Sequence, residues 1–270
     1  MTTGLPYRLI ATDLDGTLLT PAETVSARTR AALATATAAG ATHIIVTGRA
    51  APWARPVFDE IGYTGIAVCG QGAQVYDAGA HKLLTSMTLD RRVAGLALAK
   101  LEAELGPLAA AANQDGLAGS VLALPSYQLE IGSDLPLRRV ETSAELFTEP
   151  ISKLYIQHPG LTDDQLADVA RRVVGDLVGV TMAGQSIVEL LPLGLSKATG
   201  LAIAARRLGL RAADTIAFGD MPNDVPMFHW AAHTVAMANA HQELLAVADE
   251  VTTSNAADGV ALVLERLYGA

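Results

Sequence analysis

Residues 7–19 read Tyr-Arg-Leu-Ile-Ala-Thr-Asp-Leu-Asp-Gly-Thr-Leu-Leu, a short apolar strand followed at once by two aspartates and a glycine. Side chains at positions i and i+2 of an extended chain point the same way, so Asp13 and Asp15 can converge on one small volume. Two like charges held that close cost free energy unless a proton or a metal ion lies between them. The bland alternative, two solvated acids that cap a turn, leaves the apolar strand and the Asp-Gly-Thr turn without explanation. We therefore interpret this stretch as a buried strand that ends in a functional site.

The same plan of strand and helix recurs at both ends of the chain. The expected strands are His43–Val46, Ile66–Cys69, Thr215–Phe218 and Thr234–Met237, and the expected helices run from an N-cap at Ser26 to Gly40 and from an N-cap at Ser196 to Gly209. This alternation predicts an α/β fold, a doubly wound, mostly parallel sheet with helices on both faces. Ligands of such sheets bind beyond the carboxyl ends of the strands, and polar clusters follow three of the expected strands there, at Asp13, Thr47 and Asp220.

The middle of the chain has a different texture. Strands are expected near 121–131, 152–158 and 180–190, with Thr162 and Gln165 at capping-box spacing before a helix. The pattern predicts an α+β module with a mostly antiparallel sheet. We expect it to be a second domain, residues 83–188, inserted into a discontinuous core domain made of 1–82 and 189–270.

Composition narrows the class of protein. Half of the 270 residues are apolar and the mean hydropathy is +0.31, but no stretch of about 18 uncharged apolar residues predicts a membrane span. The first residues lack the plan of a signal peptide, and Cys69, the single cysteine, allows no internal disulfide, so a cytoplasmic protein is expected. A net charge of −9 argues against general nucleic-acid binding and leaves small phosphorylated metabolites open as partners. The oligomeric state is not readable from the sequence.

The acids at the strand ends suit the hydrolysis of phosphate monoesters. A carboxylate can attack phosphorus first and give an aspartyl-phosphate, and attack by one anion on another needs positive charge, which Mg²⁺ supplies through hard oxygen ligands. Asp13 and Asp220 could both reach one such ion. Asp15 is positioned to protonate the leaving oxygen and then to activate water, and the backbone N–H groups around Asp15 and Gly16 can meet phosphoryl oxygens.

Three further polar positions have both a functional and an ordinary interpretation. Thr47 offers a hydroxyl to phosphate, or simply ends a strand. Lys197 lies at the start of an expected helix, where the helix dipole disfavours a cation, so an anion is expected nearby; the alternative is a solvated lysine. Asp224 belongs to a loop with Asp220 and Asn223, or is only the N-cap of the segment 225–230.

These clusters carry a family resemblance. The segments Asp13–Thr17, Thr47–Arg49, Lys197 and Gly219–Asp224, in this order, resemble the four motifs of the haloacid dehalogenase (HAD) superfamily. The segments Ala238–Ala240 and Asp258–Val260 are similar to those of its Cof-type branch, subfamily IIB, which carries a large α/β cap (type C2) between the second and third motifs. The resemblance implies a Rossmann-like core, and the middle of the chain matches the cap in size and placement.

The resemblance also implies roles for single residues. It makes Asp13 the nucleophile and a Mg²⁺ ligand, Asp15 the general acid/base and a ligand through its backbone carbonyl, and Asp220 the remaining carboxylate on the metal, with Asp224 behind it. Phosphate and substrate would be bound by Gly16, Thr47, Gly48, Arg49, Lys197 and Asn223. Relatives usually have Asn-Gly-Ala where this chain has Gln71-Gly72-Ala73, which puts the substrate contact of that amide in doubt.

The sequence therefore predicts a Mg²⁺-dependent phosphatase of small phosphorylated metabolites, such as sugar phosphates or phosphorylated cofactors, with the inserted domain as a lid. Two rivals stay open, a phosphomutase-like transfer to a sugar hydroxyl and a non-catalytic protein that binds phosphometabolites. Dehalogenation is disfavoured because it needs no metal and leaves the acid pair unexplained. The substrate itself is not legible; we expect its selection in loops such as 113–116 and 183–186.

Overall fold

A computed structural model describes residues 5–128, 137–183 and 186–269, and within them the chain forms two compact units. The first unit is built from Met1–Arg49, Ala54–Leu84 and Ser196–Ala270, and the second from Ala50–Trp53 and Thr85–Leu195. The second unit therefore interrupts the first, with boundaries a few residues away from those expected from sequence. Among the described helices, none combines the length and the apolar character needed to cross a membrane.

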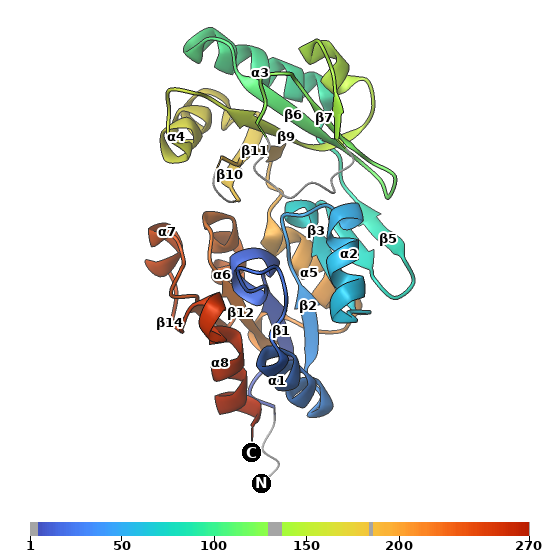
Figure 1. The fold of residues 1–270 in the computed structure, drawn as a ribbon, viewed down its shortest axis with the longest axis vertical. Coiled ribbons are helices and arrows are strands. Elements are labelled where there is room, and N and C mark those ends of the chain that lie inside the picture. Colours follow the sequence, from blue (N-terminus) through green and yellow to red (C-terminus); the bar gives the residue numbers. More distant parts are fainter. Residues whose placement is uncertain (1–4, 129–136, 184–185, 270) are drawn as a thin grey trace. The chain divides into compact units, whose positions relative to one another are not determined.

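A parallel sheet forms the centre of the first unit, with strand order β14-β13-β12-β1-β2 (Figure 1). Its strands are β1 (Leu9–Thr12), β2 (Thr42–Ile45), β12 (Thr215–Gly219), β13 (His233–Ala236) and β14 (Glu250–Val251). The opening strand β1 is fully buried and pairs with β2 on one side and β12 on the other. Strands from the two ends of the chain thus lie next to each other, which confirms the expected doubly wound α/β core.

Helices cover both faces of this sheet. They are α1 (Ala27–Ala38), α2 (Ala51–Ile61), α5 (Lys197–Arg207), α6 (Val225–Trp230), α7 (Gln242–Leu245) and α8 (Gly259–Tyr268). Successive side chains of a strand point to opposite faces, so Leu9 packs in one apolar layer with α5 and α6, and Ile10 packs in the other with α1 and α8. The Ser26 hydroxyl accepts a hydrogen bond from the Thr29 backbone and begins α1, as expected.

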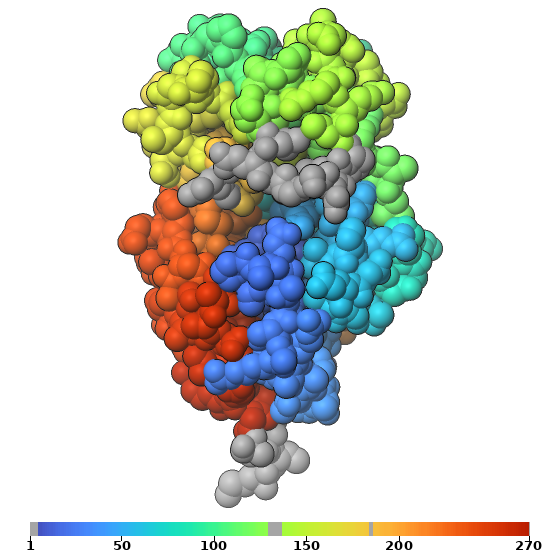
Figure 2. Space-filling view, viewed as in Figure 1, coloured from blue at the N-terminus to red at the C-terminus, as the bar shows by residue number. Residues whose placement is uncertain are grey.

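The N-terminal and C-terminal parts of the first unit meet on one face. Helices α1 and α8, blue and red in Figures 1 and 2, lie side by side. Arg28 on α1 donates two hydrogen bonds to the Glu265 carboxylate on α8, of 2.8 and 2.7 Å. Because both side chains are well exposed and screened by solvent, this ion pair adds little to stability; the apolar contacts beneath it contribute more.

One expected strand belongs to a different sheet. β3 (Ile66–Cys69) is joined to the parallel sheet by a bridge between Val46 and Val68 and not by a regular ladder. Its ladder runs antiparallel with β4 (Gln74–Asp77), in a small sheet completed by β5 (Lys82–Ser86). The short turn Gly70–Gly72 joins β3 to β4. The chain therefore forms a hairpin here and not a crossover helix leading to another parallel strand.

The second unit contains a six-stranded sheet with helices on one face. Its elements are β6 (Ala109–Gln114), β7 (Val121–Ala123), β8 (Leu137–Arg139), β9 (Ile151–Gln157), β10 (Val178–Met182) and β11 (Val188–Pro192), with α3 (Arg91–Leu105) and α4 (Asp163–Val174). The strand order is β10-β11-β9-β6-β7-β8, antiparallel except for β7 and β8. Thr162 and Gln165 form the expected capping box.

Alternation along these strands separates a face that packs on the helices from a second face, which carries both apolar and charged residues. Leu154 and Leu190 pack with α3 and α4 in the core of the unit. The neighbouring residues Lys153 and Glu189 point the other way and form a buried ion pair. One loop expectation is wrong: Asn113 and Gln114 belong to β6 and not to a loop. Residues 129–131 of an expected strand and residues 184–185 of an expected loop lie outside the described residues.

Candidate active site

The site begins where two neighbouring parallel strands end. Thr12 and Phe218 lie opposite each other in β1 and β12, so the residues that follow them leave the sheet at the same edge. Asp13 donates its backbone N–H to the Phe218 carbonyl (3.0 Å), and its side chain is buried. Asp220 follows Gly219 at the end of β12 and is buried as well. The pairing of β1 with β12 therefore brings together two acids that are 207 positions apart in the chain.

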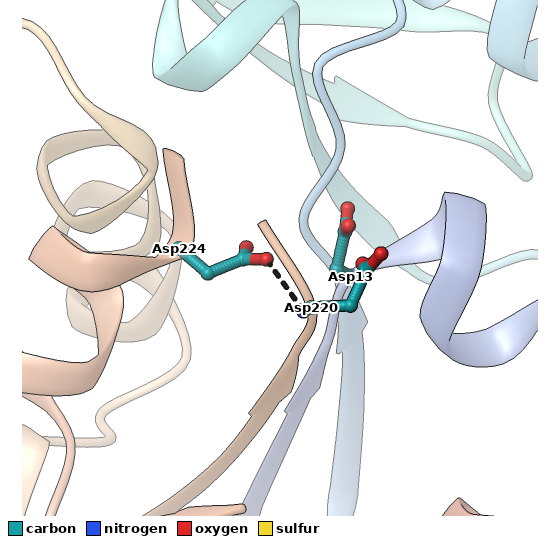
Figure 3. A group of neighbouring side chains, drawn as sticks. All are labelled: Asp13, Asp220 and Asp224. Atoms are coloured by element: carbon teal, nitrogen blue, oxygen red, sulfur yellow. Dashed lines mark hydrogen bonds between the residues drawn. The ribbon is translucent and has the colours of Figure 1, made fainter. Parts of the chain in front are cut away.

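A buried lysine links the first acid to a third one. Lys197 is the first residue of α5, and its Nζ lies 2.8 Å from Asp13 Oδ1 and 2.7 Å from Asp224 Oδ1. The other Asp224 oxygen accepts hydrogen bonds from the backbone N–H groups of Asp220 (3.0 Å; Figure 3) and Met221 (3.1 Å). Asp224 stands at the N-cap position of α6 but makes no side-chain cap bond to it. The interpretation of this residue as only a helix cap is therefore wrong, because its carboxylate binds Lys197 and two backbone N–H groups. The anions expected beside Lys197 are these two carboxylates.

The loop after β1 packs directly on Asp220. Thr17 Oγ1 donates a hydrogen bond to Asp220 Oδ1 (3.0 Å). Gly16 has φ of +72°, and a Cβ atom there would lie 2.1 Å from Asp220 Oδ2, so only glycine fits. Asn239 donates its side-chain N–H to the Gly16 carbonyl (2.9 Å), which fixes the loop from the far side.

Charge is unbalanced in this cluster. Burial, reinforced by the neighbouring carboxylates of Asp224 and Asp220 and opposed by Lys197, raises the pKa of Asp13 well above its ordinary value. Burial and the Asp224 charge raise the pKa of Asp220 to about 7. Burial would lower the pKa of Lys197, but the charges of Asp13 and Asp224 outweigh it and raise that pKa. With all three carboxylates ionised, the cluster would carry an excess of two negative charges over the single ammonium, and the raised pKa values of Asp13 and Asp220 reflect that repulsion.

This donor set fits a divalent cation. Asp13, Asp220 and Asp224 each offer an oxygen, and the three oxygens lie within 4.8 Å of one another (Figure 3). Carboxylate oxygens are the ligands that Mg²⁺ prefers, and a double positive charge would balance the excess of two. Both oxygens of Asp224 are already engaged by Lys197 and the backbone. The carboxylates of Asp13 and Asp220 are therefore the better placed ligands, with Asp224 behind them.

Asp15 and Arg49 form a separate, more exposed pair. Arg49 donates hydrogen bonds to both Asp15 oxygens, from Nε at 3.1 and 2.9 Å and from Nη2 at 2.5 Å. Glu23 Oε1 lies 3.5 Å from the same guanidinium. The Asp15 side chain is 48% exposed and that of Arg49 is 21% exposed. The acid expected to move protons is therefore open to solvent, unlike the buried Asp13.

Thr47 and Asn223 are both buried. Gln71 lies between them and is hydrogen-bonded to each. Thr47 Oγ1 accepts a hydrogen bond from the Arg49 backbone (3.0 Å), which leaves its hydroxyl proton for another acceptor. Asn223 donates its side-chain N–H to Gln71 Oε1 (3.2 Å). Gln71 in turn donates its backbone N–H to the Thr47 carbonyl (3.2 Å). The loops after β2, β3 and β12 are thus hydrogen-bonded to one another.

Comparison with known proteins identifies the family. Residues 10–264 match the haloacid dehalogenase-like hydrolases. The chain is a member of this family.

Two curated relatives and one solved structure support the match over nearly the whole chain. The 5-amino-6-(5-phospho-D-ribitylamino)uracil phosphatase YwtE of Bacillus subtilis is 30% identical over 96% of this chain and 98% of its own length. The HMP-PP phosphatase of Serratia proteamaculans is 30% identical over 88% of this chain and 86% of its own. The solved structure of the HAD subclass IIB sugar phosphatase BT4131 superposes with a TM-score of 0.79, at 20% identity, over 96% of this chain and 98% of that one. The resemblance to Cof-type HAD hydrolases is therefore confirmed.

The HAD motifs predicted from sequence fall into two groups in space. Asp13, Lys197, Asp220 and Asp224 form one buried cluster, joined at its edge by Gly16. Asp15 and Arg49 form the exposed pair. The contacts of Thr17 and Asn239 were not anticipated, although both residues belong to segments that carry the family resemblance. The only signal in the sequence was that Thr17 is a small polar residue close to the motif acids. Its hydrogen-bond partner could not be predicted, because the tertiary fold determines it.

Proposed function

We propose that this HAD hydrolase is a Mg²⁺-dependent phosphatase that hydrolyses small phosphorylated metabolites through an aspartyl-phosphate. The observation that carries the proposal is the buried cluster in which Lys197 bridges Asp13 and Asp224 while Asp220 lies beside them. Charge that is only partly neutralised by a lysine suits a site that binds a cation and a phosphoryl group together. The phosphatases among the relatives support the choice of phosphate esters.

Asp13 begins the reaction. One of its carboxylate oxygens attacks phosphorus, the new O–P bond forms, and the bond from phosphorus to the leaving oxygen breaks. Asp15, which takes up a proton from solvent when it leaves Arg49, gives that proton to the leaving oxygen. Mg²⁺ bound by the carboxylates of Asp13 and Asp220 would supply the positive charge that lets an anion approach another anion.

The second half restores the enzyme. Asp15, now ionised, takes a proton from water, and the water oxygen attacks phosphorus and displaces the Asp13 carboxylate. Lys197 and the Thr47 hydroxyl hold phosphoryl oxygens through both steps, together with the backbone near Gly16 and Gly48. Arg49 holds Asp15 in the resting protein and releases it when the leaving group arrives.

The domain assignment is part of the same proposal. Residues 1–82 and 189–270 would be the catalytic core and 83–188 the inserted cap. A cytoplasmic location is proposed with it, supported by the lone Cys69, which is buried in β3. The relatives act on unlike phosphate compounds, so the proposal stops at the class of small phosphorylated metabolites.

The decisive experiment measures phosphate release from a panel of phosphorylated metabolites and an aryl phosphate, with Mg²⁺ and with a chelator. We expect Mg²⁺-dependent release from at least one small ester. Quenching a reaction with ³²P-labelled substrate should leave hydroxylamine-labile label on the wild-type protein and none on Asp13→Asn. Label that persists in Asp13→Asn would remove Asp13 from the proposed role, and an inactive wild type across the panel would refute the activity.

A further inference from the structure

The backbone of the turn Gly70–Gly72 touches two of the segments that bear motif residues. Gly70 donates its backbone N–H to the Arg49 carbonyl (2.8 Å), and Gln71 donates to the Thr47 carbonyl (3.2 Å). On the other side, a Cβ atom on Gly72 would lie 2.1 Å from the Ser196 carbonyl, directly before Lys197. The turn is therefore packed against both the Thr47 loop and the start of α5.

Gln71, the middle residue of this turn, has a strained backbone conformation and is buried. Its φ and ψ are 61° and 24°, in the left-handed region that glycine or asparagine adopts more readily than glutamine. Its side chain is 1% exposed. A strained backbone around a fully buried amide persists only where the surrounding contacts over-determine it, which directs attention to what the amide touches.

The Gln71 amide fills the space between two motif loops. Its Oε1 accepts the hydrogen bond from Asn223 Nδ2 (3.2 Å). Its Nε2 lies so close to Gly48 that a Cβ atom there would come within 2.6 Å of it. The glutamine side chain is therefore the spacer that separates the Thr47–Arg49 loop from the loop of Asp220 and Asn223.

The hydrogen bond to Gln71 also orients Asn223. An amide has one donor side and one acceptor side, so donating Nδ2 to Gln71 directs Oδ1 elsewhere. That Oδ1 is buried and has no hydrogen-bond partner among the described residues. Buried polar atoms are nearly always satisfied, so this acceptor is available for a donor that comes with a ligand or a water molecule.

We propose that Gln71 is a positioning residue, which sets the orientation of Asn223 and the spacing of the two phosphate-binding loops and does not touch the substrate. This inference rests on the proposed phosphatase function. It assigns to the longer amide of this chain a role different from the substrate contact that the resemblance implied for an asparagine at this place.

Two substitutions separate the parts of the argument. Gln71→Asn keeps an amide and suits the left-handed backbone, but it is one methylene too short to reach Asn223. Gln71→Met keeps the length and removes the hydrogen bond. Gln242→Asn, at an exposed position, is the matched control. We expect both Gln71 variants to melt within a few degrees of the wild type, to lose about tenfold in kcat/KM, and the control to lose nothing.

The dependence on leaving group distinguishes positioning from contact. A residue that acts through Asn223 lowers kcat/KM by the same factor for an aryl phosphate and for every sugar phosphate that the wild type hydrolyses. A residue that contacts the leaving group changes the factor from ester to ester, and that result would overturn the proposal. Unchanged kcat/KM in both variants would overturn it as well.

A double-mutant cycle tests the route through Asn223. In an Asn223→Ala background, Gln71→Met should cost less than about twofold, because the partner that it positions is gone. Full additivity of the two losses would mean that Gln71 acts independently, against the proposal. The wild type in the same assay tests the phosphatase function itself, so an inactive wild type refutes that function while an active wild type with additive losses refutes only the role of Gln71.

Discussion

The two units each bury a lysine, and the surroundings of the two lysines differ in one respect. Among the residues that the structure describes, Lys153 in the second unit pairs with Glu189, and its Nζ lies 4.8 Å from the centre of the Tyr155 ring. Lys197 in the first unit meets two acids and has a third nearby. Within the described part of the chain, the first arrangement is balanced in charge and the second is not. A balanced pair has a structural explanation that is complete in itself, whereas an unbalanced cluster implies a charged ligand.

The largest expected effect comes from neutralising the attacking acid in the unbalanced cluster. Asp13→Asn should lower phosphate release by at least about 10³-fold, because the amide is a poor nucleophile. The same change removes one buried negative charge, so the metal-free variant should melt no lower than the wild type. Activity is measured by phosphate release and stability by thermal unfolding. An inactive variant that is also unfolded would mean that Asp13 is needed for stability. The charged clusters of the two units would then both be structural.

Breaking the balanced pair should give the opposite outcome. Lys153→Met leaves the Glu189 carboxylate buried without its partner and should lower the free energy of unfolding by about 3–5 kcal/mol. The double variant Lys153→Met, Glu189→Leu removes both charges and should recover most of that loss. Urea unfolding monitored by circular dichroism measures both. A Lys153→Met protein as stable as the wild type would contradict the view that this pair is structural.

Mg²⁺ should distinguish the two clusters in the absence of any substrate. At about 100 times its Kd, the ion should raise the free energy of unfolding of the wild type by about 2.7 kcal/mol. Asp220→Asn should lose this increase, since the negative charge and one of the two carboxylate oxygens are gone, and the double variant at Lys153 and Glu189 should keep it. Thermal melts with and without Mg²⁺ provide the comparison. Equal stabilisation of the wild type and Asp220→Asn would place the metal elsewhere.

The smallest effect is a pH dependence confined to the first unit. His43 on β2 is hydrogen-bonded to Thr12 Oγ1 (2.8 Å), and burial lowers its pKa to about 4. The unfolded chain takes up a proton near pH 6.5 that the folded protein refuses, so the stability contributed by His43 is complete above pH 6.5 and is lost as the pH falls to about 4. A shift of the pKa from 6.5 to about 4 corresponds to about 3 kcal/mol. Because His43 is only partly buried, we expect solvent to reduce the loss from this residue to about 1–2 kcal/mol.

The control for that pH dependence is His43→Gln. The variant should show a shallower fall of stability between pH 6.5 and 4 than the wild type, measured by urea unfolding at each pH. A wild type and a variant with parallel curves would show that His43 does not account for the acid sensitivity.

Local sequence patterns were sufficient for most elements of the first unit. Ser26 and Ser196 predict helix starts because a side-chain oxygen must satisfy the first backbone N–H groups, a requirement that is local. The pairing of β3 was not predictable in this way. A strand has the same apolar pattern whether it continues a parallel sheet or turns back into a hairpin, and the Gly-Gln-Gly turn that decides the matter contains a residue in an unfavourable conformation.

Site chemistry divides along the same line. The strand-end acids were identifiable because like charges at the end of a buried strand cost free energy unless a proton or a cation lies between them. The behaviour of Asp224, which binds Lys197 and two backbone N–H groups instead of capping a helix, depends on residues nearly thirty positions away. The role proposed for Gln71 depends on Asn223, which lies 152 positions further along the chain. Such partners are set by the fold and not by neighbouring sequence.

The interrupted connectivity of the first unit has a consequence for biosynthesis. Strand β12 lies between β1 and β13 in the sheet, yet it leaves the ribosome some two hundred residues after β1. The second unit, almost contiguous in the chain, is complete before β12 exists. Until then β1 has one edge without a partner, and such edges recruit other strands. Nascent chains stalled just before Thr215 should therefore engage chaperones through β1 and β2, and release them once β12 has been made.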